Sequence, residues 1–141
     1  MAANNGWRGI PEPRLQVSDR PLRFSFKHLH LEHGRFHINN CNNQFLLDFI
    51  YSIREFSTWT VDAFTDQYNN FHRHSFGFEG TTEPNGFLAA PNIDPDQLGL
   101  HEAWQFAVPC ESAEVLGRVH GILIDDTFFV VWLDPNHQLF T

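Results

Sequence analysis

One segment near the end of the chain, residues 117–140 (GRVHGILIDDTFFVVWLDPNHQLF), constrains the fold most strongly. Two apolar stretches, Val115–Ile124 and Thr127–Asp134, flank the pair Asp125-Asp126, which can form a two-residue turn. Both stretches are rich in the β-branched and aromatic residues that favour strands. We therefore predict that this segment forms a β-hairpin.

The predicted turn sets the register of the hairpin, because it pairs His120 with Val131. Two residues further from the turn, Arg118 pairs with Leu133. One face is then apolar throughout and is expected to pack against the helices; it comprises Val119, Gly121, Leu123, Phe128, Val130 and Trp132. The other face carries Arg118 and His120. Burying an arginine without a partner is costly, so we expect this end of the hairpin to open to water, a carboxylate or a ligand.

Two other segments are predicted to be strands. Leu22–Leu31 (LRFSFKHLHL) alternates with the period of a strand, and a change of apolar face near Lys27 indicates either a bulge or the emergence of the strand from the core. Trp104–Val108 also alternates and precedes the hairpin closely in sequence. We expect this second strand to extend the hairpin into an antiparallel sheet.

Two helices are predicted between these strands. Asn42 or Asn43 can cap a helix over Gln44–Phe56, whose expected buried stripe is Leu46, Phe49, Ile50 and Ile53. A second helix is predicted over Trp59–Tyr68, with Ser57 or Thr58 as its cap.

The segment Asn69–His101 is rich in proline and glycine and is predicted to be a long loop. Within it, HSFGFE can form a short strand, and Asp94-Pro95 can begin a brief helical turn. The predicted fold class is therefore α+β: an N-terminal strand, two helices, a long loop and a C-terminal antiparallel sheet that ends in a hairpin. Residues 22–141 form one domain, and residues 1–21 are expected to be a flexible extension.

Composition limits the possible partners of the domain. The formal net charge of −8 argues against a general phosphate-binding surface. No stretch approaches the ~20 apolar residues that span a bilayer, and residues 1–21 lack the apolar run of a signal peptide. Cys41 and Cys110 are widely spaced, as expected of reduced thiols. We expect a cytoplasmic protein with no membrane partner.

The order and the amino-acid sequence of the C-terminal segments resemble those of the RelE/ParE superfamily of small toxins. The likeness covers about residues 104–140, where WQFAV, GRVHGILIDD and TFFVVWLDPNHQLF are similar to the family's Trp-containing strand, Arg-bearing strand, acidic turn and last strand. Strand, two helices and a three-stranded meander is also the element order of that fold.

This resemblance implies a ribonuclease that cleaves RNA, free or on the ribosome, without a metal or other cofactor. By position, Arg118 would stabilise the charge that develops on phosphorus. His120 and His137 would share the acid and base roles, because an imidazole titrates near neutral pH. His74, from the long loop, could add a general base. The candidate substrate-binding residues are Trp104, Glu83, Asp134 and Arg54.

Other interpretations stay open. Arg118 could simply pair with Asp134 or Glu114, and His120 could be an ordinary half-buried residue of the sheet. The acidic charge also fits a non-catalytic module that binds a protein partner, as an antitoxin, an inhibitor or a defence-system subunit does.

A metal-dependent enzyme is a third possibility. The chain has nine histidines, and HLHLEHGRFH and HRH bring several of them close in sequence. No HExxH or clustered Cys/His pattern accompanies them, so we expect no metal site.

Overall fold

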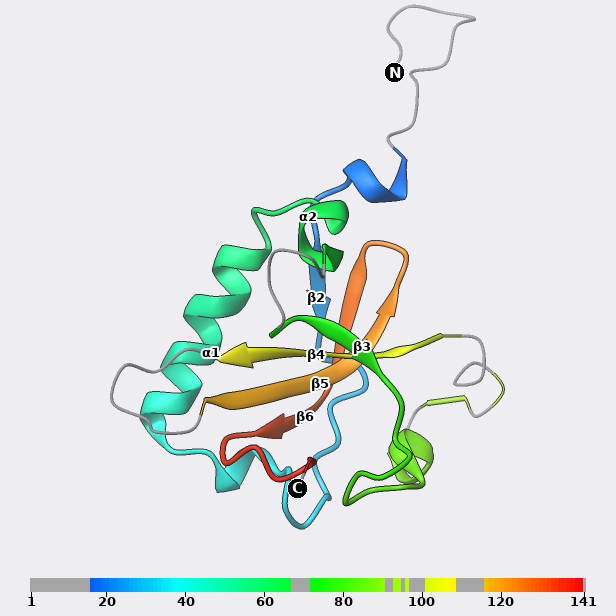
Figure 1. Cartoon of the computed structure of the whole chain (residues 1–141). Coiled ribbons are helices and arrows are strands. Elements are labelled where there is room, and N and C mark those ends of the chain that lie inside the picture. Colours follow the sequence, from blue (N-terminus) through cyan, green and yellow to red (C-terminus); the bar gives the residue numbers. More distant parts are fainter. Residues whose placement is uncertain are drawn as a thin grey trace, which may run out of the picture.

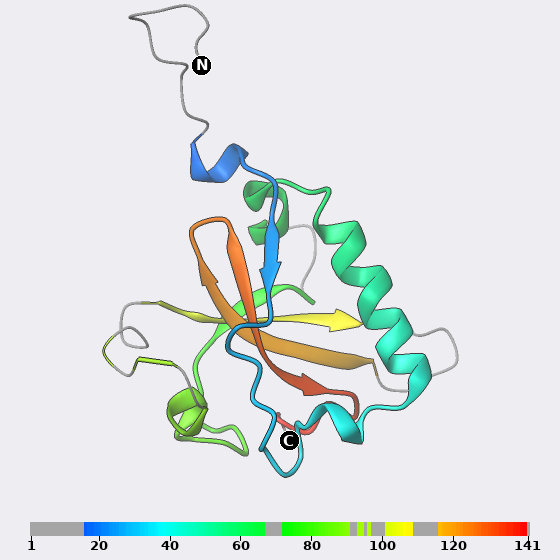
Figure 2. The ribbon, with the colours of Figure 1, turned by 180° about the vertical axis from the view of Figure 1, so that it is seen from behind.

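A computed structural model describes residues 16–66, 72–90, 93, 94, 96, 101–108 and 116–140. In this part of the chain, five strands form one mixed sheet in the order β2-β6-β5-β4-β3. The long helix α1 lies along one face of the sheet (Figure 1). Seen from behind, α1 and β2 are nearest the viewer (Figure 2). The predicted α+β class is confirmed.

The C-terminal strands follow the prediction closely. Strand β5 is Gly117–Ile124 and β6 is Thr127–Asp134, and the two are antiparallel. Asp125 begins the turn between them with a φ of 54°, in the left-handed region that aspartate tolerates better than most residues. Strand β4, Ala103–Val108, pairs with β5 on the other side. The predicted HSFGFE strand is β3, His74–Phe76, at the edge of the sheet.

The predicted register of the hairpin is right near the turn and wrong beyond it. Ile124 pairs with Thr127 as expected, but a β-bulge between His120 and Gly121 shifts the rest by one residue. His120 therefore faces Trp132, and the partner of Arg118 is Asp134 rather than Leu133. The extra residue on β6 changes which side chains share a face beyond the bulge.

Helix α1 spans Asn43–Phe56, close to its predicted bounds. The side-chain oxygen of Asn42 caps it by accepting a hydrogen bond from the backbone N–H of Phe45 at 2.8 Å. Phe45 and Phe49 are its most buried residues. The prediction that Ile50 lies in the buried stripe is wrong, because this side chain is 54% exposed. The helix contacts the sheet along Phe45 and Phe49, and this line places Ile50 on the outside.

Helix α2 is shorter than predicted. It spans Val61–Thr65, and its cap is Thr60 rather than Ser57 or Thr58. Thr60 accepts a hydrogen bond from the backbone N–H of Ala63 at 3.1 Å. Residues 67–68 of the predicted helix lie outside the described residues.

The predicted strand Leu22–Leu31 is mostly wrong. Only β2, Arg23–Ser25, forms, and it pairs with β6 in parallel, which makes the sheet mixed. The chain then turns, with the backbone N–H of Leu29 donating to the carbonyl oxygen of Phe26. His30 returns to the edge of β6, where its backbone N–H donates to the carbonyl oxygen of Val131 at 3.0 Å. The alternation thus continues through a turn rather than along one strand.

Residues 16–21 belong to the predicted extension, and the structure places them against the domain. Val17–Asp19 form a 3-10 turn, and Val17 packs on the main core. The backbone N–H of Val61 donates to the carbonyl oxygen of Arg20 at 2.9 Å. Residues 1–15 lie outside the described residues.

Both faces of the sheet are buried. The face beneath the helices carries the main core, in which Phe64, Phe106 and Phe128 are fully buried. A second core lies on the opposite face around Trp132, under non-helical segments, with Phe36, Phe87, Ile122, Val131 and Leu139. Because both Val131 and Trp132 enter this second core at the bulge, Trp132 lies on the face opposite to the predicted one. No described helix is long and apolar enough to cross a bilayer.

Candidate functional site

A line of polar side chains crosses the second face of the sheet. We call it the polar row: His74 on β3, Gln105 on β4, His120 on β5 and Asp134 at the end of β6. The strand register creates it, since Gln105 pairs with both His74 and His120. Side chains directly opposed on neighbouring strands share a face. The row therefore brings the predicted catalytic residue His120 to Asp134 and places a second one, His74, on the same face beyond Gln105.

His120 and Asp134 form a pair that is completely buried. Nε2 of His120 lies 3.1 Å from Oδ2 of Asp134, and both side chains are 0% exposed. The carboxylate also accepts hydrogen bonds from the backbone N–H groups of Gln138, at 2.7 Å, and Leu139, at 3.0 Å. We expected this end of the hairpin to open to water, a carboxylate or a ligand. His120 meets the carboxylate of Asp134, and neither side chain reaches water, because the C-terminal turn encloses them.

Burial and hydrogen bonding set the charges of the pair. Burial lowers the pKa of His120 below its usual 6.5, and the hydrogen bond to Asp134 only partly opposes this. Burial alone would raise the pKa of Asp134, but the hydrogen bonds from His120 and from the backbone of Gln138 and Leu139 hold it below its usual 3.8. At neutral pH the pair is thus a neutral imidazole whose Nε2–H donates to a carboxylate.

These pKa directions predict that the domain loses stability as the pH falls. The unfolded chain binds a proton on His120 below about pH 6.5, whereas the native state does not until its lower pKa is reached. In that window the free energy of unfolding should decrease by up to about 1.4 kcal/mol per pH unit for this one proton. Urea unfolding at a series of pH values from about 8 to 5 measures the slope. A flat profile below pH 6.5 would contradict the assignment.

Three buried polar atoms near the pair lack a hydrogen-bond partner among the described residues: Oε1 of Gln105, Nδ1 of His120 and Nε of Arg118. Gln105 already donates through Nε2 to Nε2 of His74, at 2.7 Å. The other nitrogen of His74, Nδ1, lies 3.0 Å from the carbonyl oxygen of Ser75 and so carries the hydrogen. Unpaired buried polar atoms are costly and uncommon. Three of them on neighbouring strands mark this region as a candidate site.

Arg118 and His137 border the polar row. The half-buried guanidinium of Arg118 donates from Nη1 to the carbonyl oxygens of Leu116, at 2.7 Å, and Gly117, at 3.2 Å. It forms no ion pair with another described residue, so the predicted pairing with Asp134 is electrostatic only. Burial lowers the pKa of Arg118, and Asp134 opposes that shift.

His137 lies in the turn after β6 with a φ of 52°, a left-handed conformation that is uncommon for a residue with a side chain. Burial lowers the pKa of this half-buried histidine, and the charge of Arg118 adds to the shift. The rings of His137 and Phe140 are 6.0 Å apart. Burial also lowers the pKa of His72, which lies just before β3, and the charge of Arg118 adds to that shift. The charges of Arg118 and His74 also lower the pKa of His120, so the predicted catalytic residues influence one another electrostatically.

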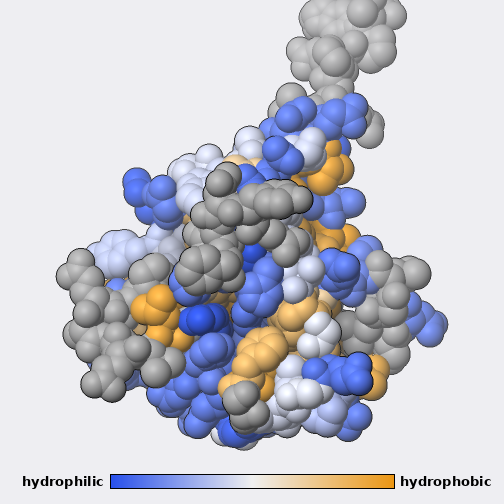
Figure 3. Space-filling model, viewed as in Figure 1, coloured by the Kyte–Doolittle hydropathy of each residue, from blue (hydrophilic) through white to orange (hydrophobic). Residues whose placement is uncertain are grey.

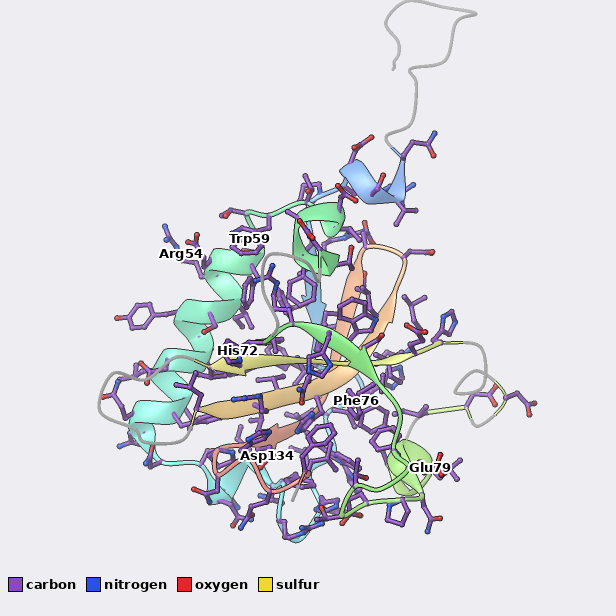
Figure 4. The ribbon with its side chains drawn as sticks, in the orientation of Figure 1. Arg54, Trp59, His72, Phe76, Glu79 and Asp134 are labelled. Atoms are coloured by element: carbon purple, nitrogen blue, oxygen red, sulfur yellow. The ribbon has the colours of Figure 1, made fainter. Side chains whose placement is uncertain are left out.

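The predicted substrate-binding residues do not gather there, with the exception of Asp134. Trp104 faces the main core on the opposite side of the sheet. Arg54 is exposed in the last turn of α1 and points away from Asp134 (Figure 4). Glu83 accepts hydrogen bonds from Arg35 and from Nε2 of His33, the latter at 3.2 Å. Glu83 thus fastens the loop that follows β3 to the segment that precedes α1.

The histidine-rich segment has structural roles. Nδ1 of His30 accepts a hydrogen bond from Nε1 of the buried Trp132 at 3.0 Å. Nδ1 of His33 accepts from the backbone N–H of Arg35, and Nδ1 of His37 accepts from that of Asn39. Among the described residues, no three His, Cys, Asp or Glu side chains are arranged to hold a metal ion.

Cys41 is a free thiol whose pKa burial and the nearby Asp134 raise to about 11. A thiol with so high a pKa is a poor nucleophile at neutral pH. Cys110 lies outside the described residues.

Gln105 is the site residue that sequence reasoning missed. Alternation over residues 103–108 already placed it opposite to Trp104 and Phe106, as a lone polar side chain on the second face. The sequence contained no signal that this face would be buried, because the segments that cover it have no regular period.

Comparisons with protein families, with curated proteins and with solved structures find no match for this chain.

Proposed function

We propose that this chain is a small metal-independent ribonuclease of the RelE/ParE type, whose site is formed by Arg118, His137 and the polar row. One observation carries the proposal. Three of the four residues named from the sequence as catalytic, Arg118 and His120 on β5 and His137 in the C-terminal turn, interact with the single carboxylate of Asp134. The fourth, His74 on the edge strand β3, joins them through Gln105 in the polar row.

The proposed reaction needs three kinds of group. The ribose 2′-hydroxyl attacks the adjacent phosphorus, the bond from phosphorus to the 5′-oxygen breaks, and a 2′,3′-cyclic phosphate and a 5′-hydroxyl form. A base takes the proton of the 2′-hydroxyl, and an acid returns a proton to the departing 5′-oxygen. Arg118 stabilises the charge on the phosphate oxygens. His137 and His120 share the proton transfers, and Asp134 orients His120 as a carboxylate orients a catalytic imidazole.

The burial of His120 sets a condition on this mechanism. The rings of Phe36, Phe76 and Phe140 surround the imidazole at centroid distances of 6.2, 5.6 and 6.2 Å. Phe140 is only half-buried and follows the C-terminal turn. A substrate reaches Nδ1 of His120 when this ring moves aside, so Phe140→Ala should leave cleavage intact or increase it.

Incubation of the purified protein with single-stranded RNA, alone and on ribosomes, tests the proposal. We expect cleavage that leaves a 2′,3′-cyclic phosphate and that persists in the presence of a chelator. Arg118→Ala and His137→Ala should each slow cleavage by about 100-fold or more. Arg23→Ala, which changes an exposed arginine on β2, is the matched control. If the folded protein cleaves neither substrate, or if the chelator abolishes cleavage, the proposal is wrong.

A second candidate function is binding to a protein partner without catalysis. The observation that favours it is an apolar patch on the outer side of α1, formed by Leu47, Ile50 and Tyr51, with exposed fractions of 53%, 54% and 68%. Positions spaced by three and four residues form one continuous stripe on a helix. A partner of positive charge would suit the acidic chain. This function would be supported instead if the wild-type chain cleaves no RNA and co-purifies with such a partner, and if the Tyr51→Glu variant no longer does.

A further inference from the structure

Gln105 joins the half-buried end of the polar row to its fully buried end. It lies on β4, between His74 of the edge strand β3 and His120 of β5. His74 is half-buried, whereas Gln105 and His120 are buried. Strand β3 lies in front of the other strands in Figure 1, and the same view in Figure 3 shows hydrophilic surface over the middle of this face. Protons from solvent therefore reach the row at His74.

The hydrogen bonds of His74 fix the orientation of the Gln105 amide. Nδ1–H of the neutral imidazole donates to the carbonyl oxygen of Ser75 at 3.0 Å. Nε2 of the same ring is then an acceptor, and Nε2 of Gln105 donates to it at 2.7 Å. In this orientation two buried acceptors on directly opposed residues, Oε1 of Gln105 and Nδ1 of His120, lack a donor among the described residues. Buried acceptors without a donor cost free energy.

A proton on His74 reverses the requirement for the Gln105 amide. Both ring nitrogens of an imidazolium are donors, so Nε2–H of His74 would face the NH2 group of Gln105 at the same short distance. Nδ1–H keeps its hydrogen bond to Ser75 and holds the ring in place. A half-turn of the amide about its Cγ–Cδ bond removes the conflict, because it exchanges the oxygen and the nitrogen without moving the backbone. Oε1 of Gln105 then accepts a charge-assisted hydrogen bond from His74.

We propose that protonation of His74 turns the amide of Gln105, and that the turned NH2 group donates to Nδ1 of His120. We call this rotation the amide switch. It supplies both missing partners at once. Directly opposed residues on neighbouring strands have Cβ atoms about 5 Å apart, which is within the reach of a glutamine amide. The polar row then becomes one chain of hydrogen bonds in which each residue donates to the next, from His74 through Gln105 and His120 to Asp134.

The amide switch keeps His120 neutral. The ionisable groups of described residues that interact with His74 or His120 are His72 before β3, Arg118 on β5, Asp134 on β6 and His137 in the C-terminal turn. The charge of a protonated His74 opposes a second proton on His120. The turned amide has the same effect, because it occupies Nδ1, the atom to which that proton would bind. His120 therefore stays in the form whose Nε2–H donates to Asp134.

The amide switch does not depend on the proposed ribonuclease function, but its consequence for cleavage rests on that function. Nδ1 of His120 is the atom that a substrate reaches when Phe140 moves aside. Once Gln105 donates to this atom, it cannot accept the proton of a 2′-hydroxyl. Protonation of His74 would thus turn off the base while Asp134 still holds the imidazole in place.

NMR spectroscopy of the ¹⁵N-labelled whole protein, titrated from about pH 8 to about pH 5, tests the amide switch. Long-range ¹H–¹⁵N correlation spectra give the tautomer of each imidazole and the chemical shift of each ring nitrogen. We expect the signal of Nδ1 of His120 to move upfield, as a nitrogen that accepts a hydrogen bond does, with the same midpoint as His74. Nuclear Overhauser contacts of the NH2 protons of Gln105 should pass from the ring of His74 to the ring of His120.

Two variants separate the amide switch from the electric field of a charged His74. Gln105→Met keeps the length of the side chain and removes the amide, so the response of Nδ1 of His120 should be lost while His74 still titrates. Gln44→Met makes the same change at an exposed position of α1 and should leave the response intact.

The outcomes separate the amide switch from the ribonuclease. An NH2 group of Gln105 that already contacts His120 at about pH 8, or a constant Nδ1 signal of His120 while His74 titrates, would overturn the switch without the use of any variant. An unchanged response in Gln105→Met would overturn it too. RNA cleavage by a protein without the response would reject the switch and leave the ribonuclease intact. The full response in a protein that cleaves no RNA would support the switch and reject the ribonuclease.

Discussion

Replacement of Asp134 with alanine is expected to lower the free energy of unfolding by about 3–5 kcal/mol. The carboxylate is 0% exposed and accepts hydrogen bonds from His120, Gln138 and Leu139. Its loss leaves the N–H groups of His120, Gln138 and Leu139 without this acceptor and removes the contact that ties the C-terminal turn to β6. Asp134→Asn should also destabilise the domain, because the amide nitrogen cannot accept a hydrogen bond.

Urea unfolding at neutral pH, followed by circular dichroism, measures both variants. Asp62→Asn is the matched control, since Asp62 lies exposed on α2 and should change stability by less than about 1 kcal/mol. If Asp134→Ala were as stable as this control, the buried pair would not hold the C-terminal turn. The proposed orientation of His120 by Asp134 would then lose its basis.

Replacement of Gly121 with alanine is expected to lower the free energy of unfolding by about 3 kcal/mol or more. No other addition of a single methyl group should destabilise the domain more. A Cβ at this position would overlap the backbone oxygen of Phe129 and the ring of Phe128. Gly121 adjoins the bulge in β5 and β6, where the strands approach closely, so relief would require the hairpin itself to shift. We expect the Gly121→Ala variant to be marginally stable or unfolded.

Thermal and urea unfolding of Gly121→Ala against Gly77→Ala test this expectation. Nothing lies within 4 Å of a Cβ at Gly77, and its φ is not in the left-handed region. The control should therefore match the wild-type chain or gain slightly, since alanine restricts the unfolded state. A Gly121→Ala variant of unchanged stability would mean that the strands separate at the bulge more easily than the register indicates.

The two proposals depend on the same short stretch of structure. The bulge turns Trp132 into the second core and brings Asp134 opposite Arg118. Without the shift, Leu133 would occupy the position opposite Arg118, and Trp132 would face the helices. The candidate site and the chain of hydrogen bonds that ends at Asp134 are thus consequences of one extra residue in β6.

Local signals were sufficient for much of the fold. The cap at Asn42 and the apolar period of residues 44–56 predicted α1 to within one residue, because both act through contacts of a single helical turn. The turn at Asp125-Asp126 predicted β6 to its exact bounds for the same reason. The resemblance to RelE/ParE toxins stays a prediction.

Partners distant in sequence decided the rest. Alternation in residues 22–31 predicted one long strand, but pairing with β6 stops at Ser25 and the chain turns away. Apolar and polar residues alternate with period two both before and after a bulge. The sequence pattern therefore does not reveal that the strand register shifts by one residue at the bulge. The predicted faces of Leu133 and Trp132 were wrong for that reason.

The amino-acid sequence by itself determined the α+β class, the first helix and the hairpin. Only the tertiary structure decided that the region around His120 and Asp134 is buried. The second face of the sheet is covered by segments without a regular period, which are held by contacts such as the hydrogen bond from Thr82 to Leu139. Contacts of this kind depend on the whole fold, so no local pattern predicts the side chains that they enclose.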